Sequence, residues 1–143
     1  MGEALCLPPM KIALFVVLLD LLALVGFTYW ALESDGVAVV ETAKADGSAR
    51  STHVWFATTD GALWLEAGKP ENGWFQDVQR EPHLWLTRDG QRERFLAEPL
   101  PNPEGHERVR AMLREKYGLR DRWIAFLFDT SRSVAVRLVP APE

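Results

Sequence analysis

Two short segments of this 143-residue chain carry side chains that could bind a phosphate group beside a planar ring. The residues with this chemistry are Arg50, Ser51, Thr52, Gly68, Lys69 and Trp74. A phosphate needs cationic and N–H or hydroxyl donors along one edge, and an indole offers a flat apolar surface to a ring. The pattern therefore indicates an anion site beside an aromatic wall. The alternative is that Arg50 and Lys69 are solvated turn charges and that Trp74 belongs to the core.

Other catalytic or metal-binding arrangements are not found in the sequence. His53, His83 and His106 are scattered and none belongs to a His-x-x-x-His pair, so we expect no metal site. The single cysteine, Cys6, precedes the most apolar segment, which excludes a disulfide within the chain and argues against a Cys–His nucleophile. Hydride transfer on a bound cofactor needs little from side chains beyond orientation, so redox chemistry stays open with no catalytic residue assigned.

The two segments are expected on neighbouring strands. Ala49–Thr58 is rich in β-branched and aromatic residues, and Ala62–Ala67 follows it after a tight turn at Thr59-Asp-Gly61. The two strands therefore form a hairpin. Because hairpin partners are adjacent, their functional ends could face the same groove.

The remaining elements complete a small β domain. We expect strands at Val37–Ala43, His83–Thr87, Glu93–Glu98 and Ser133–Val139, and helices at Trp74–Arg80, from Asn102 to about Gly118, and at Trp123–Phe128. In the second helix, Asn102 is expected as N-cap and Pro103 as the first helical residue. Trp123 is expected in the core. Six short strands with two or three helices predict a mainly β fold, a six-stranded antiparallel barrel in which closure removes exposed edges.

An apolar segment near the N-terminus predicts a transmembrane helix. Residues 12–32, from Ile12 to Leu32, contain a single charge, Asp20, and would be about 31 Å long as a helix, enough to cross a bilayer. Tyr29 and Trp30 lie where an aromatic belt is expected. The run is too long for a typical cleaved signal peptide, which is the alternative. We thus divide the chain into a tail at 1–11, a transmembrane helix at 12–32 and a barrel domain at 33–143.

Two features of this segment leave alternatives open. Lys11 and Lys44 are the flanking cations on the two sides, and they favour an N-terminus in the cytoplasm with the domain outside. A carboxyl group in mid-span costs about 2.5–3.5 kcal/mol on insertion scales. Asp20 is either a functional group, such as a proton-carrying or quinone-facing one, or a protonated carboxyl tolerated by a very apolar helix.

The charge balance limits the partners. The net charge of −4, from 16 basic and 20 acidic residues, argues against nucleic-acid binding, which needs a basic surface. Basic residues do gather between Arg108 and Arg122, but acidic residues are interleaved with them. We interpret this stretch as a solvated helix face with internal ion pairs, the alternative being a patch for anions or lipid headgroups.

Two segments in this order resemble a known family. They are Gly47-Ser-Ala-Arg50-Ser-Thr52-His-Val-Trp55-Phe and Leu63-Trp-Leu-Glu-Ala67-Gly68-Lys69-Pro-Glu-Asn-Gly-Trp74-Phe75, continuing to Pro82. Together they are similar to the deazaflavin-dependent nitroreductases, which are among the pyridoxamine 5′-phosphate oxidase-like split barrels. This chain departs from the family pattern with Phe75 for the usual Tyr and with Glu81-Pro82 for Asn-Pro. Lys116-Tyr117-Gly118 and Asp121-Arg-Trp123 look like a membrane-anchored subgroup.

The resemblance implies a six-stranded split barrel that binds FMN or the 8-hydroxy-5-deazaflavin coenzyme and that is commonly a homodimer. The cofactor-binding residues would be Arg50, Ser51, Thr52, Ala67, Gly68, Lys69, Trp74 and Phe75. The implied function is a membrane-anchored oxidoreductase that passes a hydride to a quinone-like or nitro acceptor. The alternatives are a non-catalytic binding module on the same barrel, which the departure at Phe75 favours, and an accessory subunit of a membrane complex.

Overall fold

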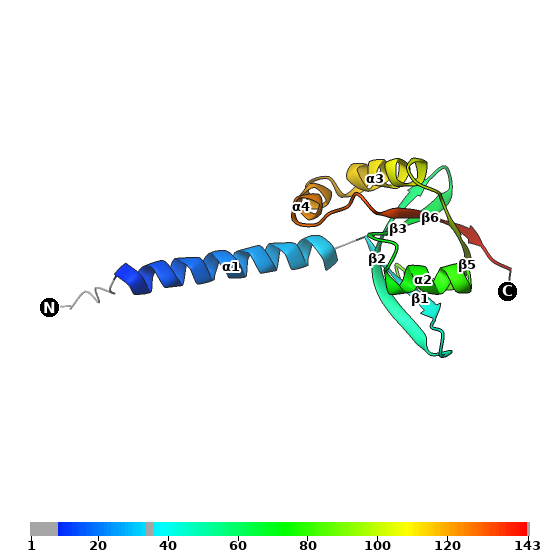
Figure 1. The fold of residues 1–143 in the computed structure, drawn as a ribbon, viewed down its shortest axis with the longest axis horizontal. Helices are drawn as coiled ribbons and strands as arrows, with labels where there is room; N and C mark the ends of the chain where they lie inside the picture. Colours follow the sequence, from blue (N-terminus) through cyan, green and yellow to red (C-terminus); the bar gives the residue numbers. More distant parts are fainter. Residues whose placement is uncertain (1–8, 34–35, 143) are drawn as a thin grey trace.

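The computed structural model describes residues 9–33 and 36–142 and consists of one barrel with a long helix projecting from it (Figure 1). The elements in chain order are α1 (Pro9–Glu33), β1 (Val37–Ala43), β2 (Ala49–Thr59), β3 (Ala62–Ala67), α2 (Gly73–Arg80), β4 (His83–Arg88), β5 (Gln91–Pro99), α3 (Glu104–Tyr117), α4 (Leu119–Leu127) and β6 (Val134–Pro140). The tail predicted at 1–11 lies mostly outside the described residues, and Cys6 lies outside them entirely.

The strands form a closed antiparallel barrel in the order β1-β2-β3-β6-β5-β4, with β4 returning to β1. The six-stranded barrel predicted from the sequence is therefore confirmed. Side chains alternate between the two faces of each strand, as pleated strands require, and the inward residues fill the interior. Val40, Leu65, Leu86 and Val136 are completely buried there.

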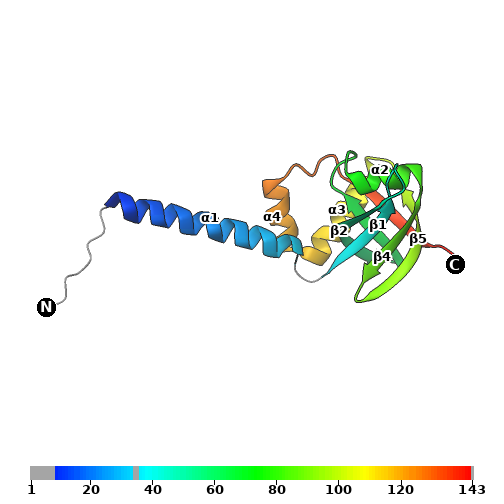
Figure 2. The same cartoon turned by 90° about the horizontal axis from the view of Figure 1, so that it is seen from below.

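Two helices cover different parts of the barrel. α3 packs on the outside of β2 and β6, where Val109 and Leu113 meet Trp55 in a second apolar cluster. α2 lies at the barrel mouth beside β1 and places Trp74 and Phe75 in the same core cluster as the barrel interior (Figure 2). The helix that covers the outside and the helix at the mouth thus bury separate cores.

The start of α3 differs from the prediction. The helix begins at Glu104, and Pro103 occupies the N-cap position instead of the first helical turn. Asn102 still caps the helix, because its Oδ1 accepts the backbone N–H of His106 at 3.1 Å while its Nδ2 donates to the carbonyl of Ser133. Gly118 ends α3 with a φ of +54°, in agreement with the predicted helix end.

α1 contacts the domain through its last two turns, from Phe27 to Glu33. The stretch Met10–Glu33 is long and apolar enough to cross a membrane, and its large side chains are exposed. At its end, Trp123 Nε1 donates to Thr28 Oγ1 at 3.1 Å and Trp55 Nε1 donates to the carbonyl of Leu32 at 3.3 Å. The prediction that Trp123 packs in the core is wrong, because its side chain is only half-buried. Its ring lies edge-on to Phe27 of α1, with the ring centroids 5.0 Å apart.

Tyr117 connects α3 to the start of the barrel and generates a stability prediction. Its hydroxyl lies 2.5 Å from the carbonyl oxygen of Gly36 and accepts the N–H of Phe56 at 3.2 Å, and its ring stacks on Trp55.

We expect Tyr117→Phe to lower the free energy of unfolding by about 1–2 kcal/mol, because buried backbone groups lose their partner. Urea unfolding in detergent would measure this, with Tyr29→Phe, an exposed hydroxyl on α1, as the control. Equal effects of the two changes would contradict the role of this hydroxyl.

Candidate functional site

A hollow lies where β2 and β3 separate. β2 pairs with β3 only from Phe56 to Thr59, whereas it pairs with β1 over its whole first half. The edge of β2 before Phe56 therefore has no strand beside it on the β3 side among the described pairings. A hollow of about 330 Å³ occupies this region, and its walls include Thr52, Glu66 and Trp74. The two segments that the sequence singled out converge here, as expected for hairpin partners.

Arg50 forms an ion pair with the buried carboxylate of Asp77, a residue that the sequence analysis did not single out. Its Nε donates to Asp77 Oδ2 at 2.7 Å, and the same oxygen accepts Thr42 Oγ1 at 2.8 Å. Arg80 reaches the other oxygen at 3.3 Å. A Cβ on Gly73 would lie only 2.6 Å from a terminal nitrogen of Arg50, so the guanidinium lies directly against the start of α2. Arg50 thus fixes α2 to β2 and keeps 37% of its side chain exposed.

The protonation of Asp77 follows from this environment. Burial by itself raises the pKa of the carboxyl, but hydrogen bonds from Arg50, Thr42 and Arg80 outweigh it, and the pKa lies below its ordinary value. Asp77 is therefore an ionised structural group at neutral pH.

The other predicted cofactor residues fall into two groups. Thr52 lines the hollow, and Lys69 is exposed in the loop before α2, with no ion-pair partner among the residues that the structure describes. Ser51 alternates with Thr52 along β2, so its side chain points to the opposite face of the strand. Both segments thus provide hydrogen-bond donors, Thr52 from β2 and Lys69 from the loop after β3. Ser51 points to the face of β2 opposite to Thr52.

The apolar members of the predicted set are buried. Ala67, Trp74 and Phe75 have exposures of 0%, 2% and 3%. Trp74 packs edge-on against Phe75, with ring centroids 6.0 Å apart, so its ring does not offer the exposed flat surface expected from the sequence. Trp74 still contributes to the wall of the hollow, where it can limit the space for a bound ring. Their assignment as cofactor residues stays a prediction.

A second charge cluster adjoins the hollow through Glu66, which is part of the wall. Arg110 is 6% exposed, donates to Glu66 at 2.9 and 3.1 Å, and also donates to Asp121, which is 1% exposed. The interpretation of the basic stretch as a solvated face is therefore wrong for Arg110, because burying a guanidinium requires carboxylates within reach. Each partner lies on a different element, so spacing along the chain gave no signal for this cluster.

The histidines contact nearby side chains. His53 Nδ1 lies 2.6 Å from Glu33 of α1, and His83 Nδ1 lies 2.6 Å from Glu81. His106 lies beside Ser133. Within residues 9–33 and 36–142, no group of three or more His, Cys, Asp or Glu side chains could hold a metal ion.

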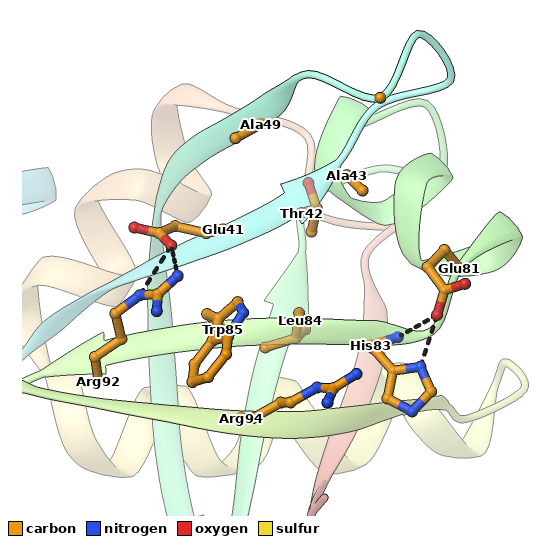
Figure 3. A pocket seen from close by; sticks show the side chains of 11 residues that line it. Glu41, Thr42, Ala43, Ala49, Glu81, His83, Leu84, Trp85, Arg92 and Arg94 are labelled. Atoms are coloured by element: carbon orange, nitrogen blue, oxygen red, sulfur yellow. Dashed lines mark hydrogen bonds and ion pairs between the residues drawn. The ribbon is translucent and has the colours of Figure 1, made fainter. Parts of the chain in front are cut away.

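A larger hollow of about 620 Å³ lies on the far side of the barrel, over β1, β4 and β5. Figure 3 shows Arg92 bridging to Glu41 there and His83 bonded to Glu81. The guanidinium of Arg92 also lies 4.0 Å from the ring centre of Trp85. None of the eight residues predicted to bind a cofactor lines this hollow, so the smaller hollow is the candidate site.

Comparison with solved structures identifies the fold. A conserved hypothetical protein of Mycobacterium tuberculosis matches with a TM-score of 0.61 and 22% identity, over 82% of this chain and 80% of that one. A protein named F420 reductase matches with a TM-score of 0.54 and 17% identity, over 80% and 93%. A FAD-binding protein of Mesorhizobium loti matches with a TM-score of 0.56 and 17% identity, over 78% and 86%.

The chain has the split-barrel fold. This is the fold that the sequence resemblance implied, and the F420 reductase and the FAD-binding protein are of the kinds that the resemblance named. No protein-family model matches the chain, and no curated protein matches it. At these identities the split-barrel likeness establishes the fold, and the activity has to be argued from the site.

Asp77 generates the prediction for this site. We expect Asp77→Asn to lower the free energy of unfolding at pH 7 by about 1–3 kcal/mol, because Arg50, Arg80 and Thr42 lose a charged acceptor. A carboxyl with a lowered pKa stabilises the fold above its unfolded pKa and loses that contribution as the pH falls through the folded value. The variant should therefore lose less stability than the native protein on acidification.

Urea unfolding in detergent from pH 7 down to pH 3 would measure both effects. Asp60→Asn is the matched control, because Asp60 is exposed in the β2–β3 turn. An Asp77 variant with native stability and a native pH profile would show that the Asp77 carboxylate does not hold α2.

Proposed function

We propose that this protein is a membrane-anchored, flavin- or deazaflavin-dependent oxidoreductase that passes a hydride to a quinone-like or nitro acceptor. The names of the matching proteins support a cofactor of this class, since one is an F420 reductase and another binds FAD. The single observation that carries the proposal is the position of the hollow. Leu32 and Glu33, at the end of α1, form part of its wall together with the predicted cofactor residue Thr52.

The side chains present suit the phosphate of such a cofactor. Thr52 lines the hollow, and two cations that do not line it come from the same two segments: Lys69 is exposed, and the ion-paired side chain of Arg50 is 37% exposed. Cations and hydroxyl donors arranged along one edge are what a phosphate requires. The unpaired edge of β2 adds backbone groups that could bond to the polar edge of a ring. The bound cofactor would supply the hydride, and the protein would orient the ring and exclude water.

The acceptor is inferred from where the hollow opens. A helix able to cross a membrane ends at its rim, and Ile124 of α4 contributes a further apolar wall. Quinones with long apolar tails reside in the bilayer. A site at the end of a transmembrane helix therefore favours a lipid-soluble acceptor over one that diffuses in water. We further propose that the domain lies outside the cytoplasm and that two copies form a homodimer, which a mass measurement in detergent would test.

A non-catalytic binding module is the second candidate. The burial of Trp74 and Phe75 favours it, because neither ring is exposed to stack on a flavin. Phe75 also lacks the hydroxyl that the similar family usually has at this place. A module of this kind would hold a small ligand or a membrane partner without turning over an acceptor, and an accessory subunit would purify with a stoichiometric partner.

Lys69 tests cofactor binding without affecting the fold. We expect Lys69→Ala to weaken binding of FMN or the deazaflavin coenzyme about tenfold, because one charge-assisted contact to a phosphate contributes about 1.5 kcal/mol or more. Titration of the full-length protein in detergent, followed by absorbance and by thermal stabilisation, would measure it. Lys44→Ala, in the β1–β2 turn away from the hollow, is the control. If neither cofactor binds or stabilises the native protein, the proposed function fails.

A further inference from the structure

Exposed apolar side chains outside α1 gather on one short helix. Among the described residues after α1, the large apolar side chains that are exposed are Trp85, Leu119, Phe126, Leu127 and Phe128. Four of these five belong to α4 or to the residue that ends it. The exposed fractions reach 76% at Leu119 and 81% at Phe126. A concentration of this kind on an otherwise polar domain marks a contact surface.

α4 buries a charge and exposes large apolar side chains, although Ile124 packs partly against the domain. The residue of α4 that is buried against the domain is Asp121, which is bonded to Arg110, whereas Phe126 and Leu119 point outward. A helix on a water-soluble domain normally buries its apolar stripe and exposes its charges. The outer side of α4 is therefore matched to an apolar environment, and the charge on its inner side is already neutralised by the domain.

α4 is held at the end of the membrane helix. Trp123 bonds to Thr28 and lies against Phe27, and Arg120 Nε donates to the carbonyl of Ala31 at 2.8 Å. Figure 2 shows α4 lying across the end of α1, on the side of the barrel from which α1 projects. If α1 crosses a bilayer, its aromatic residues Tyr29 and Trp30 mark the interface, and α4 lies at that level.

We propose that α4 is an interfacial helix that lies in the headgroup layer and inserts Leu119, Phe126 and Phe128 among the acyl chains. The inference rests on the proposed membrane anchoring by α1. A bilayer is favoured over a protein partner because the apolar side of α4 adjoins the exposed apolar surface of α1. The exposed Arg122 adds a cation that suits anionic headgroups. Two elements then fix the barrel against the membrane, and the hollow, which Ile124 lines, faces the headgroup layer.

Fluorescent labelling of the full-length protein in vesicles tests this placement. A Cys6→Ser background would carry Phe126→Cys on α4, Leu18→Cys in the middle of α1, or Gln91→Cys at the β4–β5 turn, each labelled with an environment-sensitive dye. The vesicles would contain phosphatidylcholine and phosphatidylglycerol, with or without a lipid whose nitroxide lies near the glycerol. Such helices lie roughly 5–10 Å deep, so we expect the nitroxide to reduce emission at position 126 about twofold or more and to leave position 91 unchanged.

The emission of the dyes at positions 18 and 126 separates the possible failures of the proposal. If the dye at position 18 is shielded by lipid and the dye at position 126 emits as in water, the interfacial helix is wrong and the anchoring by α1 stands. A dye at position 126 that is shielded but is not quenched by the nitroxide would show that protein covers α4, which also overturns the proposal. If the dye at position 18 is exposed to water, both the anchoring and the interfacial helix fail.

Discussion

The insertion of α2 into the mouth of the barrel is the constraint on which the rest of the structure depends. Trp74 and Phe75 enter the barrel core from this helix, and they occupy space that cross-strand side chains would fill in an evenly closed barrel. β2 and β3 pair over only four positions and then separate. The hollow lies at this separation and Trp74 forms part of its wall, so the position of α2 and the shape of the candidate site are connected. If the Trp74 ring were exposed to solvent, the core at the mouth of the barrel would lose one of its large side chains.

A helix of eight residues needs more than apolar contacts to stay in this position. Asp77 supplies the fixed point because it collects bonds from β1, β2 and α2 itself, through Thr42, Arg50 and Arg80. Arg50 therefore has a structural role: its Nε holds α2 through Asp77, while 37% of its side chain stays exposed. A substitution at Arg50 would therefore lower stability, whereas Lys69 has no ion-pair partner among residues 9–33 and 36–142 and can be changed without breaking such a contact.

The strands were predictable and the charge clusters were not, for a physical reason. Turns such as Asp60-Gly61 and Asp89-Gly90 adopt positive φ, and their residue types mark the strand ends locally, so the predicted strands lie within one or two residues of the observed ones. Arg110 and its two carboxylate partners are brought together by packing of separate elements. Residue type cannot reveal that an arginine in a charged stretch is buried. Equally, Trp123 begins an apolar run and was expected in the core, and only the position of α1 explains its surroundings.

The second charge cluster connects the candidate site to the side of the domain from which α1 projects. Glu66 lies in the wall of the hollow, Arg110 lies on α3, and Asp121 lies on α4, so one buried guanidinium links three elements. Because Asp121 is neutralised on the inner side of α4, the outer side is free to be apolar without leaving a buried charge unpaired. The same helix then contributes Ile124 to the hollow and contacts α1 through Trp123. The position of α4 and the shape of the hollow are therefore coupled, since a displacement of α4 would move a wall of the candidate site. In the proposed oxidoreductase, this coupling would tie the shape of the site to the placement of α4 at the membrane.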